Sequence, residues 1–424
     1  MKAFISARPN RALIWLAHTL FPVLLKAMQN IKEIIISEED RKMLRGLEKK
    51  RVLLFTNHPT TAEPPITFRM GRLLNSNFTF MGSRQVFNWN FGLVGPAIRR
   101  LGAFSVIAGT ADRESMKASR NAIARKAGKL IIFPEGEPTS GENDTIMPFQ
   151  PGVAQLGLWG LEDARRQEPG ADVTVVPGFI KYVIDASPDK IIKDMQKSLS
   201  KLEKNLDIEA GDRSLPRRFL TIGRVLLEKY ENLYKIEVND TTDFDYRVGR
   251  VRHALLDDVA QKLKVKGYDT GGDAIHKLRK LFSTVEMLQV GYHDKNLPAV
   301  DKKTIKWAHE KCIQAFDFIV IKRGYIIEKP SPERLYEWLD RFESLVSGKP
   351  PRALGGAPHH LPRRAYVIFA EPFLLSEYLA DEKKQKKEMV TRLTGRIRKD
   401  IEGLLEKSDT LTRPLFQRED FGEL

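Results

Sequence analysis

The chain has 424 residues, 42% of them hydrophobic, which is enough for two or three domains with cores of their own. A charged share of 29% excludes a protein that crosses the membrane many times. The formal net charge of +15 indicates an anionic partner, for which nucleic acid, an anionic bilayer and phosphorylated substrates all qualify.

The first predicted elements are two N-terminal helices, at about residues 10–29 and 38–47. An apolar run covers residues 12–25, but a histidine, a threonine and a proline interrupt it, and it falls short of the roughly 20 residues that span a bilayer. A basic residue follows directly and no cleavage site stands out, which disfavours a signal peptide. An interfacial helix with basic flanks fits, and so does a helix packed on the protein's own core. We assign residues 1–48 to N-terminal amphipathic, membrane-associating helices.

Short strands and helices alternate from about residue 52 to residue 182. The runs that read as buried strands are residues 52–56, 79–82, 104–107, 130–134 and 173–179. Helical stretches, such as residues 115–127 and 152–158, lie between them. Such alternation predicts an α/β fold with a mixed, largely parallel sheet flanked by helices.

The pattern becomes almost wholly helical after residue 188. Apolar residues recur there at steps of three and four, which is typical of packed helices. A Gly/Pro-rich linker near residues 348–358 then precedes a strand at 365–369 and a helix at 377–406. We therefore expect a discontinuous α/β domain, residues 49–188 and 361–424, with a helical insertion and linker at residues 189–360.

The insertion contains Cys312, the only cysteine of the chain, so no intramolecular disulfide forms and a reducing compartment is favoured. Its place in a helical pattern indicates a buried structural thiol. The helical stripes predict packing alone, and they leave open whether the insertion is a lid, a dimerisation surface, a docking site for a carrier protein or a scaffold.

Polar residues follow two of the predicted strands, where α/β sheets place their chemistry. Asn57, His58 and Glu63 come after residues 52–56, and Glu135 and Gly136 come after residues 130–134. A neutral histidine can take a proton from a hydroxyl, while a carboxylate on its other ring nitrogen fixes the tautomer. A single histidine–carboxylate pair of this kind also fits a hydrogen bond with a purely structural role.

Other chemistries fit these residues less well. The five-residue step from His58 to Glu63 is not that of a helical zinc pair, and no third ligand is evident, so the sequence disfavours a metal. No serine or cysteine nucleophile lies in a recognisable elbow, so direct attack by a substrate hydroxyl is the simpler mechanism.

Taken together, the motifs resemble those of the glycerolipid acyltransferase family, whose best-known member acylates lysophosphatidic acid. The similar blocks are Asn57-His58 with Glu63, residues 101–106, Phe133-Pro134-Glu135-Gly136 with Ser140, residues 149–154, and Val175-Val176-Pro177. Their order and spacing agree with the family. The resemblance covers about residues 12–182 and 364–405 and leaves out the helical segment.

The resemblance implies transfer of a fatty acyl group from a thioester to a hydroxyl of a glycerolipid-type acceptor such as lysophosphatidic acid, as in phospholipid biosynthesis. His58 and Glu63 would be the catalytic pair, with His58 as general base and Glu63 orienting it. Asn57, Glu135 and Gly136 would bind substrate, the last two by shaping the glycerol-binding loop. Acyl-CoA or an acyl carrier protein would be the co-substrate, with no metal or other cofactor.

The same resemblance implies an acceptor that is a lysophospholipid or a glycerol phosphate, and a peripheral, monotopic place on the cytoplasmic side of an anionic membrane. The basic surface fits this place, because anionic head groups attract basic residues by about 1 kcal/mol each. A nucleic-acid partner is disfavoured, since the basic residues are dispersed and no recognised binding module appears.

Three departures from the family pattern bear on the site. Glu63 replaces the usual aspartate, the arginine expected after Val106 is absent, and residues 137–139 replace the usual Thr-Arg. Arg113, or the pair Arg99 and Arg100, would then contact the phosphate. The missing arginines concern head-group recognition, and they keep a second reading open: a catalytically inactive phospholipid-binding protein of the same fold.

Overall fold

The computed structural model describes residues 4–107, 112–136, 144–150, 152–379 and 386–422. Their contacts form two compact units. The first unit holds the described residues of Met1–Thr139, Asn143–Val183 and Pro362–Leu411, and the second those of Ile184–Leu361 and Thr412–Leu424.

The first unit is built on a sheet that has eight strands within the described residues, in the order β1-β7-β6-β2-β5-β3-β4, with β8 paired to β6. The strands are β1 (Ile31–Ile35), β2 (Val52–Thr56), β3 (Thr79–Ser83), β4 (Ala103–Val106), β5 (Lys129–Ile132), β6 (Thr174–Ile184), β7 (Arg363–Phe369) and β8 (Phe373–Leu374). β2 runs parallel to β5 and β6, β3 runs parallel to β4 and β5, and β8 is antiparallel to β6. The predicted α/β fold with a mixed, largely parallel sheet is confirmed.

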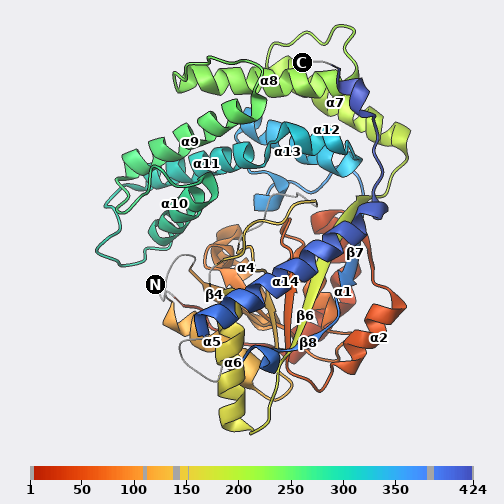
Figure 1. The fold of residues 1–424 in the computed structure, drawn as a ribbon, viewed down its shortest axis with the longest axis vertical. Helices are drawn as coiled ribbons and strands as arrows, with labels where there is room; N and C mark the ends of the chain where they lie inside the picture. The colour runs from red at the N-terminus through yellow and green to blue at the C-terminus, as the bar shows by residue number, and fades with distance from the viewer. Residues whose placement is uncertain (1–3, 108–111, 137–143, 151, 380–385, 423–424) are drawn as a thin grey trace. The chain divides into compact units, whose positions relative to one another are not determined.

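Helices cover both faces of this sheet, which explains why β2 is buried at every position and apolar from Val52 to Phe55. Alternate residues of the strand serve the two faces: Leu54 packs in one core cluster, and Leu53 and Phe55 in the other. The first face carries α1 (Arg11–Gln29), α2 (Glu38–Gly46), α3 (Glu63–Met70) and α4 (Val94–Leu101). The second carries α5 (Arg113–Ala124), α6 (Val153–Gln167) and α14 (Lys386–Ser408), and α14 lies across the strands in Figure 1.

The N-terminal segment is part of this unit. β1, which the sequence analysis missed, pairs in parallel with β7, and the backbone oxygen of Asn30 accepts the N–H of Arg363 at 2.9 Å. The alternation of buried and exposed residues along β1 is weak, because only Ile31 is wholly buried and Lys32 and Glu33 are exposed at the sheet edge. The expected helices at residues 10–29 and 38–47 are therefore present as α1 and α2, with an edge strand between them.

The second unit is helical. It holds α7 (Pro188–Asn205), α8 (Leu215–Leu233), α9 (Phe244–Leu263), α10 (Ala274–Gln289), α11 (Lys302–Val320), α12 (Arg323–Glu328) and α13 (Pro332–Ser347). Short 3-10 turns among the described residues of both units are η1 (Val86–Asn88), η2 (Asn90–Gly92), η3 (Arg352–Leu354), η4 (Leu375–Tyr378), η6 (Asp409–Leu411) and η7 (Arg418–Phe421). α9 packs against α10 and α11, and Cys312 on α11 is fully buried, which raises the pKa of its thiol. A buried structural thiol is what the sequence analysis predicts.

The end of the chain packs differently from the expectation that residues 361–424 close the α/β domain. Residues after Leu411 belong to the helical unit. The backbone N–H of Leu415 donates to the Pro330 oxygen at 2.8 Å, and Arg217 donates to the Phe421 oxygen at 3.0 Å. These contacts join positions far apart in sequence, which hydrophobic periodicity does not reveal.

Candidate active site

The candidate site lies where β2 and β5 end side by side. Phe55 pairs with Ile132, so His58 and Glu135 stand three residues beyond paired positions of parallel strands. After His58 the chain turns through a short loop and enters α3, whose first residue is Glu63. Pro64 and Pro65 favour a helix start there, because the first turn leaves backbone N–H groups unpaired in any case. This turn brings the Glu63 side chain back toward His58.

His58 and Glu63 form a hydrogen-bonded pair. The Nδ1 atom of His58 lies 2.8 Å from Oε2 of Glu63. Since a carboxylate only accepts hydrogen bonds, the contact places the proton of a neutral imidazole on Nδ1 and the basic lone pair on Nε2. The His58 side chain is 13% exposed and that of Glu63 is fully buried, so the carboxylate is shielded while the ring reaches the surface of the site.

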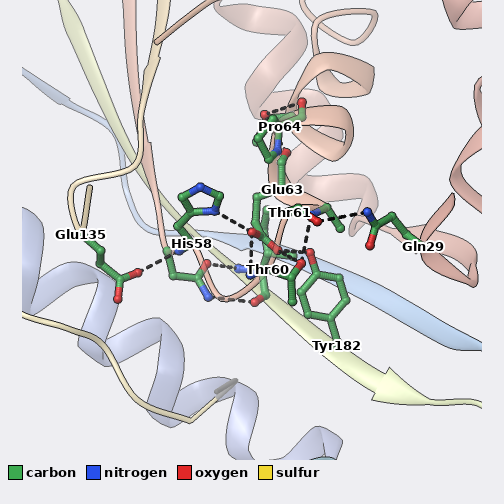
Figure 2. A network of polar contacts seen from close by, with 12 residues as sticks. Gln29, His58, Thr60, Thr61, Glu63, Pro64, Glu135 and Tyr182 are labelled. Atoms are coloured by element: carbon green, nitrogen blue, oxygen red, sulfur yellow. Dashed lines mark hydrogen bonds and ion pairs between the residues drawn. The ribbon is translucent and has the colours of Figure 1, made fainter. Parts of the chain in front are cut away.

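Both oxygens of Glu63 are held by donors, as Figure 2 shows. Oε2 also accepts the backbone N–H of Thr60 at 2.9 Å, and Oε1 accepts the Thr60 hydroxyl at 2.8 Å. The hydroxyl of Tyr182, on β6, donates to Oε1 as well. Burial raises the pKa of Tyr182 well above its ordinary value, so this hydroxyl stays protonated and remains a donor. The carboxylate is therefore fixed in position before any substrate binds.

Glu135 holds His58 from the opposite side (Figure 2), through the backbone. Its Oε1 accepts the N–H of His58 at 2.8 Å, and its Oε2 accepts the N–H of Met147 at 2.7 Å. The side chain is fully buried, and this desolvation raises its pKa to about 7 although the two N–H donors oppose the shift. Glu135 thus ties the loop after β2 to residues 144–150, and it stands behind the histidine.

Asn57 also has a supporting position. Its Nδ2 donates to the Ile180 oxygen at 3.0 Å, and its Oδ1 accepts the Ile180 N–H at 2.7 Å. The side chain is 2% exposed, so it links the end of β2 to β6. Phe133 stacks on the imidazole, with ring centroids 4.5 Å apart, and fixes the ring plane from the β5 side.

Gly136 adopts a left-handed backbone with φ of 86°, and a Cβ there would meet Cγ of Gln150 at 2.4 Å. Glycine is thus needed for the turn and for the close approach of the chain that follows it. The structure brings together four of the residues predicted from sequence: Asn57, His58, Glu63 and Glu135. Of these, Asn57 and Glu135 are enclosed, and their contacts position the loop.

The candidate phosphate ligands occupy different edges of the sheet. Arg99 and Arg100 end α4, the helix before β4, and therefore lie at the amino edge, away from His58. Arg113 begins α5, the helix after β4, so it belongs to the carboxyl edge and is exposed there. Residues 108–111 and 137–143, where the family pattern departs, lie outside the described residues.

Three further residues were missed by sequence reasoning. Thr60 and Tyr182 bind Glu63, and Arg84 follows β3 directly. Two of them could have been found from the sequence, because Thr60 is a polar residue in the loop after β2 and Arg84 is a basic residue at a strand end. Tyr182 could not, because it reads as one more apolar position of a buried strand.

Within the described residues there is no group of three or more His, Cys, Asp or Glu side chains able to hold a metal ion. His58 and Glu63 both belong to a segment that matches a known family.

Residues 26–181 match the family model described as Acyltransferase. The matched segment includes the His58–Glu63 pair, Glu135 and most of the parallel sheet, and it ends before the helical unit begins. The match supports acyl transfer as the general activity of the first unit. No curated protein matches the chain.

Proposed function

We propose that the protein transfers a fatty acyl group from a thioester donor, acyl-CoA or an acyl carrier protein, to a hydroxyl of a glycerolipid-type acceptor such as lysophosphatidic acid. The observation that carries this proposal is the 2.8 Å contact between His58 Nδ1 and a Glu63 carboxylate that three other donors hold in place. It is the arrangement that a histidine base requires.

In this mechanism Nε2 of His58 takes the proton of the acceptor hydroxyl as its oxygen attacks the thioester carbonyl. The new C–O bond gives a tetrahedral oxyanion, which collapses with cleavage of the C–S bond. The leaving thiolate then takes the proton from His58. Glu63 stabilises the imidazolium between these two transfers, and it keeps its own negative charge throughout.

We further propose Arg84 beside Arg113 as a contact for an acidic head group. Phe80 pairs with Ile131, so Arg84, four residues on, is level with Glu135, which is itself level with His58. Strands β2 and β3 are two spacings apart, about 10 Å, which suits a head group whose hydroxyl sits at His58. The Arg84 side chain is 3% exposed and donates to Oδ1 of Asn88 at 2.8 Å, so its guanidinium is held close to the end of β3.

We propose a peripheral place on the cytoplasmic side of an anionic membrane, as expected for a lipid acceptor. α1 is long and apolar enough to cross a membrane, with 19 residues and a mean hydropathy of 1.3 over its most apolar 18-residue window. Only 17% of that window is buried in the protein. Its contacts favour a helix that lies on the surface instead. His18 stacks on Phe68 of α3 at 4.3 Å, and Arg69 donates to the His18 oxygen at 3.1 Å, so the middle of α1 is held against the domain.

Thioester consumption by the purified protein, with palmitoyl-CoA and lysophosphatidic acid, tests the proposal when it is run beside His58→Ala. We expect turnover that the substitution abolishes. Equal turnover in both proteins would contradict the role of His58. The absence of turnover in both, repeated with glycerol 3-phosphate and an acyl carrier protein donor, would favour a phospholipid-binding protein without catalysis.

A further inference from the structure

Large exposed apolar side chains gather in two segments of the first unit. Of the twelve within the described residues, nine belong to α1 or to the η2 segment, residues 89–93. Those of α1 are Trp15, Leu16, Leu20, Val23, Leu24 and Met28, and those of the η2 segment are Trp89, Phe91 and Leu93. Such a concentration of exposed apolar side chains marks an interaction site.

Phe91 is the most exposed of them, at 106%, and its backbone conformation directs the side chain toward solvent. Asn90 and Phe91 have φ of 47° and 58°, a left-handed conformation that bulky side chains rarely adopt. The turn is clamped from within: Phe87 is 3% exposed, and a Cβ on Gly95 would meet the Phe87 oxygen at 2.4 Å. Strain of this kind persists where the surrounding structure enforces it, and it is concentrated at functional positions.

Both segments belong to one layer of the unit. Phe21 of α1 and Phe87 of η1 pack in the same core cluster, against the same face of the sheet, with Ile98 of α4 beside it. The start of the chain is also tied to α4, since the N–H of Arg8 donates to the Arg99 oxygen at 2.9 Å. The apolar side chains that remain exposed are therefore carried on the outer side of a single layer.

The charges of these segments identify the partner. Residues 4–32 carry four basic residues and no acidic one, and residues 64–107 carry five arginines and no acidic residue. The chain as a whole has 55 acidic residues beside 70 basic ones, so a stretch without any acid is unusual. Apolar and aromatic side chains in segments without an acidic residue, with Lys26 exposed near the end of α1, suit an anionic lipid surface, where rings insert at head-group depth and basic residues meet phosphates.

We propose that Trp89, Phe91 and Leu93 insert into an anionic bilayer surface as a second contact beside α1. The inference rests on the lipid acceptor of the proposed function and assigns it an entry side. The η2 segment follows β3 at the carboxyl edge, where His58 lies, and Gln29 at the end of α1 donates to Thr61, in the loop after His58, at 3.2 Å. With α1 and the η2 segment both inserted near the site, the edge of the first unit that carries His58 would face the lipid.

Binding to vesicles of phosphatidylcholine and phosphatidylglycerol tests the contact, with the double variant Phe91→Ser, Leu93→Ser compared with the full-length wild type. We expect the affinity to fall at least about tenfold, because two large apolar side chains no longer leave water. The matched control is Leu374→Ser, an exposed leucine on β8. β8 pairs with the first residues of β6 at the opposite edge of the sheet, so this change leaves binding unaltered. An unchanged affinity in the double variant would overturn the proposal.

A dye that reports polarity, attached at Phe91→Cys, gives a second measurement, since Cys312 is buried and does not compete for the label. We expect its emission to shift to the blue on vesicles, and no shift for a dye at Leu374→Cys. A blue shift caused by raising the protein concentration without lipid would show instead that a second copy covers the segment. We expect His58→Ala to bind vesicles as the wild type does, so a failed docking test and a failed catalytic test remain distinguishable.

Discussion

The carboxylate of Glu135 accepts the backbone N–H of His58 at 2.8 Å from a fully buried position. The glutamate of the Phe-Pro-Glu-Gly block thus acts on the loop that carries His58, and it is enclosed between that loop and Met147. Two motifs that lie 77 residues apart form one rigid unit, in which the ends of β2 and β5 hold each other.

Burial of Glu135 makes the stability of the protein depend on pH. Its folded-state pKa of about 7 lies above the ordinary value of 4.5, so the folded state binds this proton more tightly than the unfolded state does. Its contribution is complete below pH 4.5 and is lost as the pH rises through 7. The free energy of unfolding should fall by up to about 3 kcal/mol over that range.

Urea unfolding at pH 5 and pH 8, for wild type and Glu135→Gln, measures this contribution. Relative to wild type, the free energy of unfolding of Glu135→Gln should be higher at pH 8 than at pH 5, since glutamine does not ionise. A difference that is the same at both pH values would show that Glu135 titrates normally.

Glu63→Gln tests the charge that orients and stabilises the base. The amide oxygen can still accept the Nδ1–H of His58 while its NH₂ faces the two hydroxyls, so the change removes the negative charge and keeps the shape. We expect kcat to fall about 10²- to 10⁴-fold with little change in KM, because the imidazolium forms only during reaction. Steady-state kinetics measures both constants.

Glu39→Gln is the matched control, since Glu39 is an exposed first-turn residue of α2. It should leave both constants unchanged. A rise in KM alone for Glu63→Gln would indicate that the carboxylate binds substrate and does not assist the base.

Much of the first unit could be predicted because its local patterns are strong. β2 contains the apolar run Val52 to Phe55, bounded by Arg51 and Thr56, and the predicted range 52–56 agrees with the structure. The pairing of His58 with Glu63 follows from the short loop between strand and helix, where a spacing of five lets the chain reverse. Such features depend on neighbours along the chain.

Other features depend on contacts that no local pattern encodes. Tyr182 meets Glu63 across 119 residues, and from the sequence it looks like another core residue of β6. β1 is an edge strand whose Lys32 and Glu33 face solvent, so its alternation is hidden. Glu135 was expected to shape a substrate loop, and its contact with the His58 backbone appears only once β2 and β5 are paired.

Tyr182→Phe should lower kcat through the carboxylate that supports His58. The hydroxyl donates to Glu63 Oε1 and helps to hold the carboxylate in its orientation. Its loss leaves the Thr60 hydroxyl as the remaining donor to Oε1, so Glu63 is held less firmly against Nδ1 of His58. We expect kcat to fall about 2- to 10-fold with little change in KM, as expected for loss of one hydrogen bond of about 0.5 to 1.5 kcal/mol. Steady-state kinetics measures both constants, and an unchanged kcat would show that the Tyr182 hydroxyl does not support the pair.

Arg84→Met tests recognition of an acidic head group. If Arg84 meets the phosphate of the acceptor, KM for lysophosphatidic acid should rise about 10- to 100-fold, as expected for loss of a charge-assisted hydrogen bond of about 1.5 to 3 kcal/mol. KM for an uncharged monoacylglycerol should hardly change, because it offers no phosphate. Arg113→Met, measured with the same two acceptors, shows whether the exposed arginine of α5 shares this role.

The control for Arg84→Met is an arginine at the amino edge of the sheet. Arg125 follows α5 and donates to the hydroxyl of Thr79 at 3.2 Å, where β3 begins, so it has the same charge but contacts the opposite end of the strand. Arg125→Met should leave both KM values unaltered. Equal increases for both acceptors in Arg84→Met would mean that Arg84 supports the loop after β3, which it does through Asn88 at 2.8 Å, and that the head group is bound elsewhere.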